Sequence, residues 1–180
     1  MTFRSLLVML LMVLGLSPSA HALSNGTWAD ISDVGEFTLI VSSMAAPAIL
    51  DDWKGFRQAG YSLGTAQGIA LLGKALVHEQ RPDNTDNNSF PSGHTSVSFA
   101  AATTMYRRHG WKMGFPAYAL ATLTGSARVA ARKHYWHDVV AGAAVGIASG
   151  WLFTDAFNDK VQLLPWVDSN GGGVIVTMGW

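Results

Sequence analysis

The chain of 180 residues contains no cysteine, and only 13% of its residues are charged. The missing cysteines exclude a disulfide-stapled scaffold, a thiolate zinc site and a cysteine nucleophile. The 12 basic and 12 acidic residues balance, so no basic excess is available to neutralise a phosphate polymer, and we expect no nucleic-acid partner. Because 49% of the residues are apolar, the chain is also too hydrophobic to be disordered.

This composition leaves two kinds of protein, a compact helix-rich soluble domain or a domain partly dissolved in lipid. Residues 1–22 are typical of an export signal, with Arg4 first, an apolar run over residues 6–16, and the small residues Ala20 and Ala22 at the end. The apolar run is shorter than the roughly 20 residues that span a bilayer. We therefore predict a cleaved signal, with an uncleaved first helix as the alternative. In both cases the chain continues outside the cytoplasm.

Beyond the signal, apolar segments rich in alanine and glycine alternate with polar loops, which predicts an all-α bundle of five to six helices. We expect the bundle to occupy residues 23–160, with the active site at one end. Residues 161–180 form a short irregular or β-like tail with a strand over 174–177. The predicted helices are residues 33–50, 55–80, 92–108, 111–131 and 135–157.

The first cluster of chemically useful residues is at the end of the second predicted helix. Lys74 and Arg81 are seven residues apart, two helical turns, so they project from one face. Pro82 disfavours the helical backbone conformation at Arg81, so the helix is expected to end there. Two cations at one helix end suit an anionic ligand. On their own, however, the two residues could equally be surface side chains whose charged ends extend to an interface.

The second cluster is the segment Pro91-Ser92-Gly93-His94-Thr95, which opens an apolar helix. The start of a helix presents free backbone N–H groups and the positive end of the dipole, both of which bind phosphate oxygens. Gly93 permits close approach of a ligand, and His94 is placed to give or take a proton. Alone, the segment would equally describe an ordinary capped helix with a surface histidine.

The third cluster contains Arg128, His134 and Asp138. His134 and Asp138 are four residues apart, so they face each other at a helix start. A carboxylate on one ring nitrogen leaves the other nitrogen nucleophilic, and an arginine supplies a fork for a phosphoryl group. Together the three loops offer three cations, two histidines and the start of a helix. This combination indicates a site for phosphate or a similar oxyanion.

The charge pattern also predicts an orientation. If the helices cross a bilayer, the loops 82–91 and 126–138 lie on one outer side, and Arg107 and Arg108 lie in a short cytoplasmic turn, as the positive-inside rule asks. We therefore expect an inner-membrane protein whose site faces the periplasm. A soluble periplasmic protein is the alternative.

The three clusters resemble the signature of the phosphatidic acid phosphatase type 2 / vanadium haloperoxidase superfamily. That signature is a lysine, six residues and Arg-Pro, then Pro-Ser-Gly-His, then Ser-Arg, five residues, a histidine, three residues and an aspartate. All spacings within these motifs fit. One position departs from the pattern, because Ala127 precedes Arg128 and the nearest serine is Ser126. Ser126 is therefore in doubt as a phosphate ligand.

The resemblance implies a helical bundle and a two-step phosphatase without a metal or other cofactor. In that mechanism His134 attacks phosphorus, Asp138 orients it, and His94 protonates the leaving oxygen. The phosphate ligands that the resemblance implies are Lys74, Arg81, Ser92, Gly93 and Arg128. His137 near Asp138 would also suit a zinc site, but we assign Asp138 to His134 and predict no metal.

For substrate, the resemblance implies a phosphate monoester or diphosphate of a phospholipid, an isoprenoid or lipid A, hydrolysed at a membrane. The alternatives are a broad-specificity acid phosphatase of the periplasm and, with less support, a vanadate-dependent haloperoxidase. A phosphate-binding or scaffold protein without activity is disfavoured, because binding alone needs no nucleophile. The sequence indicates no oligomeric state.

Overall fold

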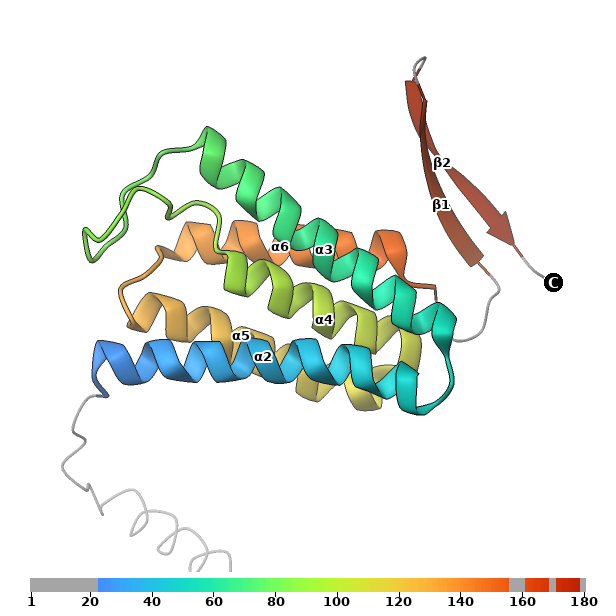
Figure 1. Ribbon diagram of the computed structural model, residues 1–180, viewed down its shortest axis with the longest axis horizontal. Helices are drawn as coiled ribbons and strands as arrows, with labels where there is room; N and C mark the ends of the chain where they lie inside the picture. Colours follow the sequence, from blue (N-terminus) through green and yellow to red (C-terminus); the bar gives the residue numbers. More distant parts are fainter. Residues whose placement is uncertain (1–22, 156–160, 169–170, 179–180) are drawn as a thin grey trace, which may run out of the picture.

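The computed structural model describes residues 23–155, 161–168 and 171–178 (Figure 1). The predicted export signal, residues 1–22, lies outside the described residues. Within the described residues, five helices run up and down in a bundle, which confirms the predicted fold class. Their bounds are α2 (Asn25–Ile49), α3 (Trp53–Leu76), α4 (Gly93–His109), α5 (Trp111–Ala130) and α6 (Trp136–Phe153).

Helix α4 is the centre of the bundle and packs against each of the other four helices. Small side chains permit this, because Ala100, Ala101 and Ala102 of α4 are fully buried. Helix α6 approaches α4 along its glycines, and a Cβ atom on Gly146 would stand only 2.8 Å from the backbone nitrogen of Ala100. The alanine and glycine content of the sequence is therefore used for close helix packing.

Three helix boundaries differ from the sequence prediction by four residues or more. Helix α6 ends at Phe153 rather than at residue 157, because Thr154 is its extended C-cap. Helix α2 begins at Asn25 rather than Asp33, because Ser24 caps it by accepting a hydrogen bond from the Thr27 backbone. Helix α3 ends at Leu76, so the segment up to Arg81 belongs to the following loop. Lys74 and Arg81 are therefore not on one helix face, which corrects the spacing argument above.

The tail forms a two-stranded antiparallel hairpin of β1 (Val161–Asp168) and β2 (Gly171–Met178), with Leu163 opposite Val176. The strand predicted over residues 174–177 lies within β2. Strand β1 was not predicted, because Pro165 lies in its interior and proline disfavours a strand.

The two polar loops, residues 77–92 and 131–135, meet at one end of the bundle, as predicted (Figure 1). An ion pair of 2.6 Å between Lys133 Nζ and Asp83 Oδ2 joins them. At the opposite end Arg108 forms a two-pronged ion pair with Asp52, the cap of α3. Among the helices that the structure describes, none combines the length and apolar character needed to cross a bilayer.

Candidate active site

A cavity of about 550 Å³ opens among α2, α3 and α4 at the end where the two loops meet. It brings together six of the eight residues that the sequence predicted for the site. These are Lys74, Arg81, Gly93, His94, Arg128 and His134. Residues that are more than 50 positions apart in the chain, such as Lys74 and Arg128, thus face one space.

The predicted His134–Asp138 pair is present at the start of α6. His134 Nδ1 lies 3.4 Å from Asp138 Oδ2, and both side chains are buried. Because Nδ1 faces Asp138, the other ring nitrogen, Nε2, is the one available to a ligand. Burial, together with Arg128 and Lys74, holds the pKa of His134 well below its usual range. The imidazole is therefore neutral and nucleophilic at neutral pH.

Asp138 is held by three hydrogen bonds, two to its carboxylate and one to its backbone carbonyl. Its Oδ2 accepts hydrogen bonds from Ser89 Oγ at 2.5 Å and from the Tyr135 backbone nitrogen at 2.8 Å. Its own carbonyl accepts the Ser92 N–H at 3.1 Å, which ties the start of α6 to the start of α4. Ser89 was not anticipated from the sequence, where it is one more polar residue of a polar loop.

Three cationic side chains line the cavity and are each held by a protein oxygen. Lys74 Nζ donates to the Asn88 carbonyl at 2.6 Å, and Arg81 Nε donates to Asp86 Oδ1 at 2.8 Å. Burial and the neighbouring Arg81 lower the pKa of Lys74 to about 8. Lys74 is consequently still charged at neutral pH, but its charge is lost at a lower pH than in an ordinary lysine.

Arg128 is the most deeply buried of the three cations. Its side chain is 8% exposed, and its Nη1 donates to Ser32 Oγ at 3.1 Å. Its Nε is buried and, among the described residues, has no hydrogen-bond partner. A buried, unpaired N–H of a guanidinium is costly unless a ligand accepts from it, so Arg128 is suited to hold an anion in the cavity.

His94 contacts two acidic residues of α2 that sequence reasoning missed. Its Nε2 lies 2.8 Å from Asp33 Oδ1 and 3.2 Å from Glu36 Oε2. Burial and then Arg128 lower the pKa of His94, while Asp33 opposes this change. Burial raises the pKa of Glu36 to about 7, with Arg128 opposing and Asp33 adding to the effect. The only signal in the sequence is a set of three carboxylates at intervals of three residues, Asp30, Asp33 and Glu36, in a helix that has no other charged residue.

Two of the serines considered from the sequence do not line the cavity. Ser92 is the cap of α4, where its side chain bonds to Thr95, and its N–H is taken by the Asp138 carbonyl. This arrangement leaves Gly93 of the helix start on the cavity wall. Ser126 is half-buried on α5 and is likewise not among the lining residues.

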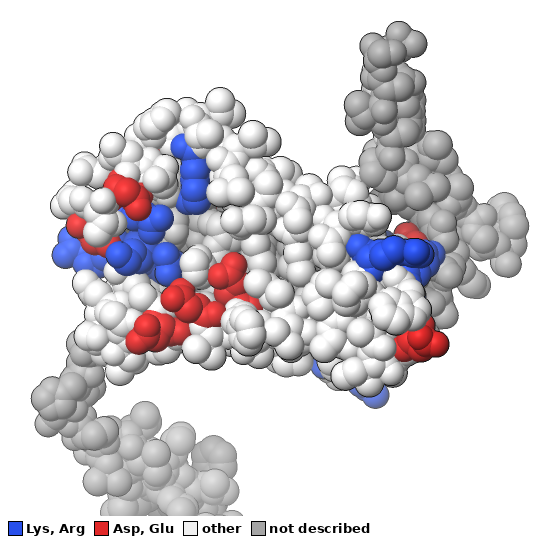
Figure 2. All heavy atoms as spheres, in the orientation of Figure 1, with Lys and Arg blue, Asp and Glu red and all other residues white. Residues whose placement is uncertain are grey.

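The charged side chains gather at the two ends of the bundle (Figure 2), and one of these groups surrounds the cavity. Figure 2 shows lysine and arginine side chains gathered at the end of the bundle where the two loops meet, with acidic side chains over α2 beside them. Cations on one side, a neutral histidine with its carboxylate, and a second histidine paired with acids form a set that suits a doubly charged oxyanion.

The sequence of this chain is similar to those of known proteins. The model of the PAP2 superfamily matches residues 55–162. A lipid A 1-phosphatase of Porphyromonas gingivalis is 37% identical over 99 residues, which are 51% of this chain and 22% of that protein. A lipid A 4'-phosphatase of Helicobacter pylori is 30% identical over 135 residues, which are 75% of this chain and 63% of that protein. The matches thus span less than two thirds of the length of either relative.

The fold is also similar to a solved structure. The crystal structure of Aquifex aeolicus LpxE superimposes with a TM-score of 0.61 over 70% of this chain and 82% of that one, at 20% sequence identity. At this identity the likeness concerns the fold alone. It agrees with the helical bundle described above.

Proposed function

Because this chain belongs to the PAP2 superfamily, we propose that it is a phosphatase that hydrolyses phosphate esters of lipids through a phosphohistidine. The observation that carries the proposal is the His134–Asp138 pair, which lies in one cavity with Lys74, Arg81 and Arg128. Phosphoryl transfer needs mainly positioning and charge stabilisation. Three fixed cations supply that charge, so the reaction requires no metal.

In the proposed first step, the lone pair of His134 Nε2 attacks phosphorus and the P–O ester bond breaks. His94 donates a proton to the leaving oxygen as its bond to phosphorus is lost. In the second step, water attacks the phosphohistidine, gives a proton to His94, and the P–N bond breaks. Asp138 stabilises the positive charge on the His134 ring, and we expect their 3.4 Å separation to shorten when phosphate is bound.

The decisive experiment compares His134→Ala with the wild-type enzyme and with His78→Ala, a matched control at an exposed histidine that does not line the cavity. We expect His134→Ala to abolish phosphate release and the acid-labile phosphoenzyme, and His78→Ala to leave both intact. Activity should survive excess EDTA. Wild-type-like turnover of His134→Ala would refute the nucleophile assignment.

A lipid substrate is supported by the apolar part of the cavity. Ile40, Leu63 and Val97 line it, and beside them a Cβ atom on Gly64 would meet no other atom within 4 Å. This space is open to an acyl or isoprenoid chain whose phosphate lies among the cations. The lipid A phosphatases among the relatives make lipid A the first substrate to assay, before phosphatidic acid, phosphatidylglycerophosphate and undecaprenyl diphosphate.

The variant Gly64→Leu tests this part of the proposal. Leucine would fill the apolar space, so hydrolysis of a lipid phosphate should fall while hydrolysis of a short, soluble phosphate ester persists. Gly60→Leu is the matched control, because Gly60 lies one turn earlier on α3, faces open space and does not line the cavity. An equal loss on both substrates would count against an acyl-chain channel.

We also propose that the protein works at a membrane with its site on the periplasmic side. Large exposed apolar side chains on the helices that line the cavity support an association with lipid. They include Phe37, Leu71, Leu72 and Leu76.

The orientation is tested with an impermeant maleimide applied to intact cells that carry one introduced cysteine, at Asn87 beside the site or at His109 at the opposite end. Labelling at His109 alone would contradict this orientation, and release of the protein by osmotic shock would favour the soluble periplasmic alternative.

A further inference from the structure

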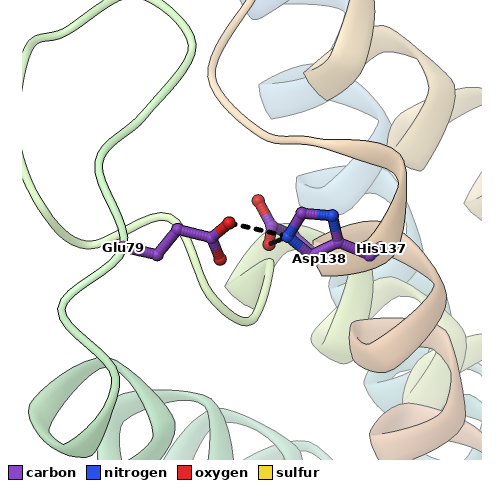
Figure 3. Close-up of side chains that lie close together, drawn as sticks. All are labelled: Glu79, His137 and Asp138. Carbon is purple, nitrogen blue, oxygen red and sulfur yellow. Dashed lines mark hydrogen bonds and ion pairs between the residues drawn. The ribbon is translucent and has the colours of Figure 1, made fainter.

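Glu79, His137 and Asp138 converge beside the candidate active site, with their side chains directed at one another (Figure 3). His137 Nε2 lies 2.7 Å from Glu79 Oε1 and 3.2 Å from Asp138 Oδ1. The three ligand atoms all lie within 4.8 Å of one another. Asp138 thus faces His134 with one oxygen and this cluster with the other.

The Asp138 oxygen in the cluster is a buried anion without a donor. Oδ1 has no hydrogen-bond partner among the described residues, and the Asp138 side chain is 0% exposed. The Nε2 proton of a neutral His137 is already directed at Glu79. A buried carboxylate oxygen that lacks a donor is costly. A cation placed between the three ligand atoms would satisfy this oxygen.

The imidazole is held in place for such a role. Its ring stacks on Tyr135, with ring centroids 5.3 Å apart and planes at 9°, and also on Phe90, with centroids 6.3 Å apart and planes at 29°. The two neighbours restrain the ring and keep Nε2 toward the carboxylates. One imidazole nitrogen and two carboxylate oxygens form a donor set that zinc takes in proteins, with water in the fourth position of a tetrahedron.

We propose that Glu79, His137 and Asp138 form a regulatory site for Zn²⁺, distinct from the phosphate cavity. Bound zinc withdraws negative charge from Asp138, so the carboxylate stabilises a charged His134 ring less well and turnover falls. The metal takes no part in the reaction and acts as an inhibitor. Zinc binding stands independently of the activity, whereas the inhibition rests on the proposed phosphatase function.

Binding is tested on the full chain without a histidine tag, by calorimetric titration with Zn²⁺ and by the visible absorption of Co²⁺ in the same site. We expect one ion per chain. Glu79→Gln and His137→Gln should each weaken binding by at least about tenfold, with folding checked by circular dichroism. The matched control is His78→Gln, next to Glu79 but outside the cluster, which should bind as the wild type does.

Inhibition is tested by phosphate release with and without Zn²⁺, each variant being compared with its own zinc-free rate. Zinc should slow the wild type and His78→Gln at least about tenfold, and Glu79→Gln and His137→Gln should resist it. Unchanged zinc binding in both cluster variants, or no binding to the wild type, would overturn the site. Equal inhibition of all four proteins would overturn the regulatory role. An inactive chain would refute the proposed function and leave the binding measurements valid.

Discussion

The Nε2 atom of His94 lies 2.8 Å from Oδ1 of Asp33, although the two residues are 61 positions apart in the chain. The same Asp33 oxygen lies 3.5 Å from Nη1 of Arg128. The acid of α2 therefore connects the proposed proton donor with a proposed phosphate ligand. This contact gives His94 a carboxylate partner, as Asp138 is the partner of His134.

We expect Asp33→Asn to lower kcat about tenfold for alkyl phosphates, whose leaving groups need a proton, and to leave aryl phosphates with good leaving groups nearly unchanged. The reason is that Asp33 favours the charged form of His94. KM should change little. Asp30→Asn is the matched control, one turn earlier on α2 and outside the cavity lining. A uniform loss across leaving groups would argue for a structural role of Asp33.

Glu36 makes the stability of the protein dependent on pH. Burial raises its pKa to about 7, so the folded state keeps a proton that the unfolded state releases from about pH 4.3 upward. Stability from this group is therefore present at low pH and is lost as pH rises toward 7. Glu36→Gln should raise the free energy of unfolding by roughly 1–3 kcal/mol at pH 8 and much less at pH 4. Urea unfolding at the two pH values measures this, and an equal change at both would contradict it.

Deprotonation of Lys74 should cause the fall in activity on the alkaline side of the pH–activity profile. Its pKa, lowered to about 8 by burial and by Arg81, means that one phosphate-binding charge is lost above pH 8. We expect kcat/KM to fall there, mainly through KM. Lys74→Arg should move the fall to higher pH, because a guanidinium stays charged. The control is Lys54→Arg, which pairs with Asp155. A fall that stays near pH 8 in Lys74→Arg would show that another group titrates.

Close packing of α6 on α4 should make Gly146 intolerant of any side chain. A Cβ atom there would overlap the Ser96 carbonyl and stand 2.8 Å from the Ala100 nitrogen, both of which are backbone. Gly146→Ala should therefore cost at least about 2 kcal/mol of stability. Gly60→Ala on α3, where a Cβ meets nothing within 4 Å, should stabilise by up to about 1 kcal/mol. Thermal unfolding compares the two, and similar melting temperatures would disprove the packing argument.

Local patterns in the sequence were sufficient to predict most of the bundle and the contact between His134 and Asp138. A serine directly before a helix start, and a histidine four residues before an aspartate, are patterns that span only a few residues of the sequence. These features appear in the structure as the cap of α4 and as the buried contact between His134, which lies just before α6, and Asp138 in the first turn of α6. The loop residues Lys74 and Arg81 also reach the cavity, although α3 ends between them.

Local patterns were insufficient where an element depends on its partner. Strand β1 contains Pro165, so its sequence alone does not indicate a strand. It nevertheless pairs along its whole length with β2. Helix α2 begins at Asn25 although residues 25–32 have a weak apolar pattern. Ser32 and Gly35 are nevertheless buried, so tertiary packing supports this first part of the helix.

The sequence by itself indicated which side chains are candidates for the phosphate chemistry, because these residues lie in three short motifs with the spacings of the PAP2 superfamily. Only the tertiary structure decided what surrounds them. Asp33 of α2 meets His94 of α4, and Glu79 of the loop after α3 meets His137 at the start of α6. Such contacts depend on how closely α4 approaches its neighbours, and small side chains spread over the whole chain set that distance. No local spacing encodes it, since each helix contributes only one side of the contact.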